Sequence, residues 1–80
     1  MPQSDSVAHG TRLRKAIDKA LETLPEEQRE VFLLREVSGL AFKDIADATG
    51  VGENTVKSRM RYALAGLKKA LQTAGFHDTG

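Results

Sequence analysis

A stretch of twenty residues, 42–61, constrains the fold of this chain more than any other part of it. It reads as a short helix, a turn at glycine, and a second helix that begins polar and becomes basic. Ala46 is small enough for two crossing helices to approach closely, and Gly50 can adopt the positive φ that ends a helix. Apolar contacts between the two helices are expected from Ile45, Val51 and Val56. This is the layout of a helix-turn-helix, whose second helix enters the major groove of DNA.

Length and composition exclude several classes of protein. The chain has 80 residues, enough for one small domain with a modest core. It contains no cysteine, so disulfides and thiolate metal sites are excluded, and we expect no metal and no cofactor. No apolar run is long enough to span a membrane, and residues 1–6 have no signal-peptide pattern. A cytoplasmic protein is therefore expected.

Charge is unevenly distributed along the chain. The formal net charge of +1, taken alone, argues against a nucleic-acid-binding protein. However, residues 26–53 are mainly acidic, whereas residues 54–74 contain no acidic residue at all. The basic residues of this second segment are Lys57, Arg59, Arg61, Lys68 and Lys69. Because attraction to phosphate depends on the local field, this segment is a candidate DNA-binding surface.

Helical spacing of apolar residues predicts an all-α fold, a compact four-helix domain that contains the helix-turn-helix and lacks winged elements. Thr11 can cap a first helix, which ends at Leu24 because the residue before a proline avoids the helical region. Pro25 suits the start of a second helix, and Ser38–Gly39 ends it. The third and fourth helices are expected over residues 41–49 and 53–74.

These boundaries predict the organisation of the chain. Residues 1–10 are polar and aperiodic, which predicts a disordered N-terminal lead. Residues 11–74 form the domain, and residues 75–80 are expected to fray as a flexible tail.

The fourth helix separates its faces clearly. At 100° per residue, one side carries the expected core residues Val56, Met60, Ala63, Leu64, Leu67 and Leu71. The opposite side carries Asn54, Lys57, Ser58 and Arg61, with Arg59 at the flank. An ordinary amphipathic helix with a solvated basic face would show the same pattern. The glycine turn and the short acidic helix directly before it favour the DNA-binding interpretation.

Several motifs at fixed separations resemble one family. In chain order they are Leu24–Arg35, Gly39–Leu40, Asp44–Ala46, Gly50 and Asn54–Arg59. Their order and spacing, over roughly residues 13–71, are similar to region 4 of bacterial sigma factors, and most of all to the extracytoplasmic-function (ECF) group of the sigma-70 family. Linked motifs of this kind are a stronger signal than a single helix-turn-helix.

The resemblance implies a role in transcription initiation rather than enzymatic activity. Region 4 binds double-stranded DNA at the promoter −35 element and docks on the β-flap of RNA polymerase, and in many ECF members an anti-sigma factor occludes it. Carried over by position, the implied DNA-binding residues are Asn54, Thr55, Lys57, Ser58, Arg59, Arg61, Tyr62 and Arg35. For Arg35 an ion pair with Glu26 or Glu30 is the alternative, and for Tyr62 packing against a neighbouring helix.

The chain also departs from the family pattern. Ala41 stands where the family usually has a serine or threonine to cap the third helix, a loss that typically costs ~1 kcal/mol. Asn54 replaces a glycine at the start of the recognition helix, and the basic positions after Arg59 are shifted, so base preference cannot be copied from the family. The region that opens DNA at the −10 element is not found in these residues.

Three other functions are alternatives to promoter binding. A protein-interaction module that does not read DNA could bind a β-flap or anti-sigma helix through Phe32, Leu33, Val37 and Leu40. A response-regulator output domain shares the four-helix layout but not the combination of motifs. An enzyme is disfavoured, because His9 and His77 lie in the expected tails and the acids are scattered. No membrane or small-molecule partner is expected.

Overall fold

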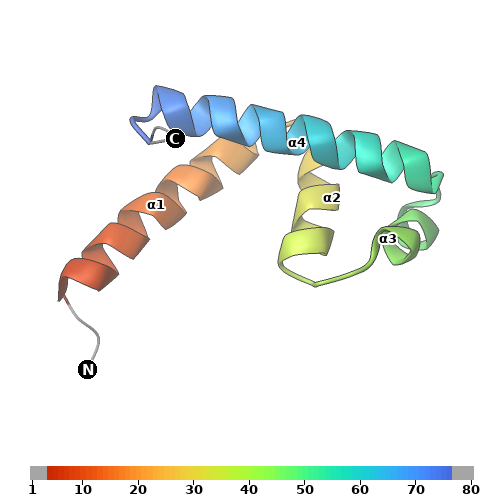
Figure 1. The fold of residues 1–80 in the computed structure, drawn as a ribbon, viewed down its shortest axis with the longest axis horizontal. Helices are drawn as coiled ribbons and strands as arrows, with labels where there is room; N and C mark the ends of the chain where they lie inside the picture. The colour runs from red at the N-terminus through yellow and green to blue at the C-terminus, as the bar shows by residue number, and fades with distance from the viewer. Residues whose placement is uncertain (1–3, 77–80) are drawn as a thin grey trace.

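The computed structural model describes residues 4–76 and the side chains of residues 11–76. This part of the chain forms four helices and contains no strand. The helices are α1 (Ser4–Glu22), α2 (Glu26–Glu36), α3 (Phe42–Thr49) and α4 (Glu53–Thr73). Figure 1 shows α4 along the length of the molecule, with α1 beneath its C-terminal half and α2 and α3 beneath its N-terminal half. The predicted all-α fold is confirmed.

Helix boundaries follow residues with strong backbone preferences. Pro25 is the N-cap of α2 in an extended conformation, and Glu26 and Glu27 lie in the first turn, where their charge favours the helix dipole. After α2, Gly39 has a φ of 73°, and Gly50 ends α3 with a φ of 74°. Ala41 caps α3 without a side-chain hydrogen bond, so the missing serine or threonine is not replaced.

The start of α1 differs from the sequence prediction. The helix begins at Ser4, so the start expected at Thr11 is wrong, and the lead expected over residues 1–10 is helical from Ser4 onward. Extending an existing helix fixes only one residue for each hydrogen bond, so weakly helical residues can continue it without an apolar stripe. Residues 1–3 lie outside the described residues.

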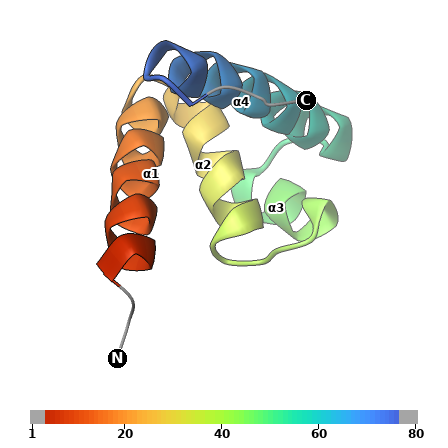
Figure 2. The same ribbon diagram turned by 60° about the vertical axis from the view of Figure 1, so that its left-hand side comes forward.

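Two hydrophobic clusters form the core, and α4 contributes to both. The first joins α1 to the C-terminal half of α4 and contains Ala20, Leu21, Leu24, Ala63 and Leu67. The second joins α2 and α3 to the N-terminal half of α4 and contains Val31, Ile45, Ala46, Val56 and Met60. Phe32 packs against both clusters. Consequently α4 links the helix-turn-helix to α1 (Figure 2).

One expected core residue of the fourth helix lies outside the core. Val56, Met60, Ala63 and Leu67 are buried as predicted, and Leu71 is partly buried. Leu64 is 49% exposed, so its assignment to the core is wrong. The apolar arc of α4 is wider than the surface that covers it, because α1 and α2 diverge below it (Figure 1).

The chain beyond α4 is also more ordered than expected at its first residues. Gly75 has a φ of 102°, and the N–H of Phe76 donates to the carbonyl of Leu71 at 2.8 Å. Phe76 is partly buried, so fraying from residue 75 is not what the structure shows. Residues 77–80 of the expected tail lie outside the described residues.

Candidate nucleic-acid interface

The turn between α3 and α4 fixes the direction of α4. Gly50 adopts the left-handed conformation, and its N–H donates to the carbonyl of Ala46 at 2.9 Å. Ile45 and Val56 are completely buried on either side of the turn. A residue with a side chain would be strained at this φ, so glycine allows the sharp reversal between the two helices. The first turns of α4 are therefore held on α3 in a helix-turn-helix.

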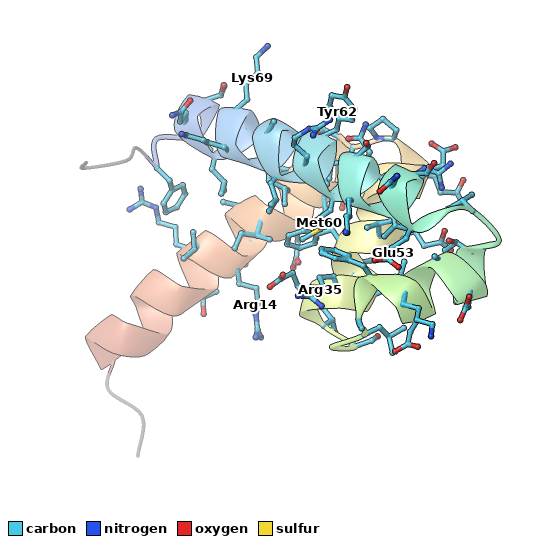
Figure 3. All side chains as sticks on the ribbon, turned by 45° about the vertical axis from the view of Figure 1, so that its right-hand side comes forward. Arg14, Arg35, Glu53, Met60, Tyr62 and Lys69 are labelled. Atoms are coloured by element: carbon cyan, nitrogen blue, oxygen red, sulfur yellow. The ribbon has the colours of Figure 1, made fainter. Side chains whose placement is uncertain are left out.

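The face of α4 opposite this core carries most of the predicted DNA-binding residues. Asn54, Thr55, Lys57 and Arg61 are exposed, and Ser58 and Arg59 are partly buried. Tyr62 is 57% exposed and points away from the other helices in Figure 3, so the packed alternative for its ring is not adopted. The structure thus brings seven of the eight predicted residues together on one helix.

Two weak contacts between side chains occur on this face, and both leave its cations accessible to solvent. The Nζ atom of Lys57 lies 3.5 Å from a carboxylate oxygen of Glu53, one turn earlier, and both side chains are about half exposed. The guanidinium carbon of Arg61 lies 5.5 Å from the centroid of the Tyr62 ring. Exposed pairs of this kind contribute little to stability. Both cations can therefore turn toward a phosphate at small cost.

Arg35, the eighth predicted residue, lies apart from this face. Its Nη1 atom donates to the carbonyl of Leu40 at 3.0 Å, and its guanidinium carbon lies 4.5 Å from the centroid of the Phe42 ring. The guanidinium thus contacts the connection between α2 and α3 (Figure 3) rather than Glu26 or Glu30. A DNA contact by Arg35 stays a prediction, whereas its role in positioning α3 is visible.

Comparison with known proteins identifies the family. A sequence model described as "Sigma-70, region 4" matches residues 14–67, which include α2, α3 and the candidate interface of α4. The chain belongs to the sigma-70 region 4 family. Sigma factors are not enzymes, which agrees with the expectation that this chain has no catalytic activity.

Curated relatives of this region 4 domain are ECF RNA polymerase sigma factors. The chain is 38% identical to EcfG of Rhodopseudomonas palustris over 76% of its length and 34% of the relative. It is 36% identical to SigK of Mycolicibacterium vanbaalenii over 91% of its length and 39% of the relative. With SigM of Mycobacterium tuberculosis the identity is 40%, over 81% of the chain and 32% of the relative. The chain therefore spans about a third of the length of these relatives.

The four residues predicted to bind a protein partner do not form one surface. Phe32 is partly buried between the two core clusters, and Leu40 packs against the second. Leu33 and Val37 are 37% and 76% exposed. Of the four, therefore, Phe32 and Leu40 contribute to the core of the region 4 domain, and Leu33 and Val37 are available on α2.

An apolar groove between α1, α2 and α4 was missed by sequence reasoning. It has a volume of about 400 Å³. Its lining residues are Ile17, Phe32, Leu64, Leu67, Lys68, Leu71, Gln72 and Phe76. Sequence reasoning placed Leu64 and Leu71 in the core and Phe76 in a fraying tail. The pair Gly75–Phe76 was an available signal, since a glycine and then an apolar residue often end a helix by folding back on it.

The described residues contain neither a membrane-spanning helix nor a cluster of metal ligands. None of their helices is long and apolar enough to cross a lipid bilayer. Within residues 4–76, no three histidine, cysteine or acidic side chains gather where they could hold a metal ion. The candidate surfaces of the described residues are the exposed face of α4, the groove, and a larger hollow of about 640 Å³ between α1, the start of α2 and α4, which Ala16, Thr23 and Gly66 help to line.

Proposed function

We propose that this domain binds the −35 element of promoters, as region 4 of an ECF sigma factor, with the N-terminal half of α4 in the major groove. One observation carries the proposal. The exposed polar and basic face of α4 begins directly after the left-handed turn at Gly50, inside the range that matches the family. That placement presents the first turns of a recognition helix to DNA.

The chemistry of the exposed side chains suggests their roles. Asn54 can donate to and accept from the edge of an adenine, and Lys57 can donate to the acceptors of a guanine. Thr55 and Ser58 carry short hydroxyl groups that suit either a base edge or a phosphate oxygen. Base reading is therefore assigned to the first two turns of α4.

The next turn is proposed to hold the DNA backbone. Arg59 and Arg61 neutralise phosphates from the two sides of α4, and the Tyr62 ring lies against sugar or backbone. No acidic residue occurs from Asn54 to Ala74, so no carboxylate of this segment opposes the approach of DNA. Each phosphate contact should steepen the dependence of log K on log salt by roughly 0.9.

Docking on RNA polymerase is the second part of the proposal. The exposed Leu33 and the apolar groove give the domain surfaces on which a helix of the β-flap or of an anti-sigma factor can bury apolar side chains. The chain spans about a third of the length of its relatives. Linkage of a domain to other binding parts raises its effective concentration at the promoter, so we expect the domain alone to bind promoter DNA with low affinity. Promoter binding of this kind takes place in the cytoplasm.

DNA binding is tested by fluorescence anisotropy at low salt, with labelled duplexes that carry candidate −35 elements. Lys57→Ala and Arg61→Ala should each weaken binding several-fold and reduce the salt slope by roughly 0.9. Lys69→Ala is the matched control, because Lys69 is exposed near the far end of α4 (Figure 3) and should leave the slope unchanged.

Amide NMR shifts locate the contact surface in the same titration. With DNA, the shifts should cluster on residues 54–62. If neither variant weakens binding, or if the shifts fall elsewhere, this face is not the DNA-reading surface. The alternative is then a protein-interaction module, which the exposed apolar side chains of Leu33 and Val37 favour.

A further inference from the structure

The hollow between α1, the start of α2 and α4 has a volume of about 640 Å³. The helices α1 and α4 meet where Leu24 reaches Gly66, and they diverge from that point toward the C-terminal end of α4 (Figure 1). Several of the residues that line the hollow are small. Ala16 and Ala20 line it from α1, and Gly66 and Ala70 line it from α4. Side chains of this size do not fill the space between two diverging helices, so the hollow stays open.

The two threonine hydroxyl groups of the lining are already engaged. Oγ1 of Thr23 donates to the carbonyl of Ala20 at 2.6 Å, and Oγ1 of Thr73 donates to the carbonyl of Lys69 at 3.1 Å. Each hydroxyl proton therefore serves the backbone of its own helix and is not a donor for a ligand. Among the described residues that line the hollow, none is aromatic and none is acidic. The wall is thus mainly aliphatic and offers no ring on which an aromatic ligand could stack.

Two lysines supply the charged groups of the described lining. Lys19 comes from α1 and Lys69 from α4, so each of these two walls carries one cation. Both side chains are exposed, and neither forms an ion pair with another residue of the described part. The aliphatic stem of a lysine can cover apolar surface while its ammonium group stays in water. The hollow therefore combines an aliphatic wall with two unpaired cations.

We propose that this hollow binds a medium-chain fatty acid, with the alkyl chain among the small side chains and the carboxylate between Lys19 and Lys69. Small-molecule sites typically have volumes of about 300–1,000 Å³, and the hollow lies within this range. Charge complementarity selects an anion, because the lining carries two cations and no acid among its described residues. The aliphatic wall selects an alkyl chain. The site lies apart from the exposed face of α4 and does not depend on DNA binding.

Binding requires only the rotation of side chains. Lys69 points away from the other helices in Figure 3, and its flexible four-carbon stem allows the ammonium group to turn toward the hollow. The bound alkyl chain contacts both α1 and α4, so it should stabilise the crossing of these helices. Because a ligand that binds only the folded state stabilises it, the Tm of the domain should rise with the concentration of the fatty acid.

The test is an amide NMR titration of the full 80-residue chain with octanoate below its micelle concentration. The shifts should cluster on Ala16, Ala20, Thr23 and Ala70, which line the hollow. Octanol is the matched probe, because it has an alkyl chain of the same length and no charge. It should bind at the same place several-fold more weakly. Added salt should weaken the binding of octanoate and not that of octanol.

Three variants separate the contributions of volume and charge. Ala16→Leu fills the hollow from a position outside the two core clusters and should abolish the binding of both probes. Lys19→Gln and Lys69→Gln should each weaken octanoate binding roughly two- to fivefold and leave octanol binding unchanged. Lys43→Gln is the matched control, because it removes the same charge from an exposed position on α3. Circular dichroism should be the same for all of these proteins.

Three results would each overturn the proposal. Octanoate shifts that are scattered over the domain, or that fall in the groove beside Phe76, would show that the hollow is not the site. Equal affinities for octanoate and octanol, or equal effects of Lys19→Gln and Lys43→Gln, would show that the hollow does not select an anion. Unchanged octanoate binding by a folded Ala16→Leu variant would show that the alkyl chain does not occupy this space.

Discussion

Arg35 stacks on Phe42, with the guanidinium carbon 4.5 Å from the centroid of the ring. The same guanidinium donates to the carbonyl of Leu40 at 3.0 Å. The side chain of Arg35, near the C-terminal end of α2, thus contacts both the connection between the helices and the first residue of α3. Because α3 supports the first turns of α4, this contact positions α4 although it lies away from the face that we propose reads DNA.

Removal of this contact should therefore lower stability. Arg35→Ala loses a charged hydrogen bond and a cation–π contact at a partly buried site, and we expect the free energy of unfolding to fall by about 1–2 kcal/mol. Urea denaturation followed by circular dichroism measures the change. Arg29→Ala, at another partly buried arginine of α2, should cost less. A fall of roughly 0.9 in the salt slope of DNA binding for Arg35→Ala would instead place Arg35 on a phosphate.

Two glycines lie in the turn before α4, and replacing each of them with serine should change the stability of the domain in opposite directions. Gly50→Ser places a side chain at a φ of 74° and should destabilise the domain by about 1–2 kcal/mol. Gly52 has a φ of −70° at the N-cap of α4, with open space where a Cβ atom would lie, so Gly52→Ser should stabilise by roughly a few tenths of a kcal/mol. Thermal unfolding distinguishes them, and equal effects would show that the left-handed turn is not needed.

Glu53 is the acid closest in sequence to the proposed DNA-reading face of α4, and it pairs with Lys57 at 3.5 Å. Glu53→Gln should raise the affinity for DNA about two- to fivefold at low salt, because it frees Lys57 and removes a charge that repels phosphate. The effect should shrink as salt is added. Asp47→Asn, at an exposed acid of α3, is the control for overall charge. A large loss of affinity confined to one −35 sequence would mean that Glu53 reads a cytosine.

The helix ends that sequence reasoning located correctly are decided by local backbone chemistry. Pro25, Gly39 and Gly50 each restrict or release φ at their own position, so no knowledge of the fold is needed to place a boundary there. The exposed face of α4 was likewise predictable, because it follows from helical periodicity and from the absence of acids between Asn54 and Ala74.

Features that depend on how helices diverge could not be predicted in the same way. Leu64 has the helical phase of a core residue, yet it lines a groove because α1 and α2 separate below it. Arg35 has the position of a phosphate contact, yet its guanidinium reaches Leu40 because the connection after α2 folds beneath it. The position of Phe76 is an intermediate case, since Gly75 supplies the local signal but only the fold shows which surface the ring meets.

The crossing of α4 with the end of α1 provides a final test, because it depends on the absence of a side chain at Gly66. A Cβ atom at this position would lie 2.6 Å from Cδ2 of Leu24, which is 8% exposed in the first core cluster. Gly66→Ala gains about 1 kcal/mol of helix propensity, but Leu24 must move in a packed core, which typically costs about 1–3 kcal/mol. We expect a net loss of about 1 kcal/mol.

The sign of this effect should reverse when the obstacle is removed. Leu24→Val lacks both Cδ atoms, and in that background Gly66→Ala should stabilise the domain, since only the gain in helix propensity remains. A double-mutant cycle by urea denaturation should therefore give a coupling free energy of about 1–2 kcal/mol between the two positions. Additive effects would mean that α1 and α4 can separate freely at this point.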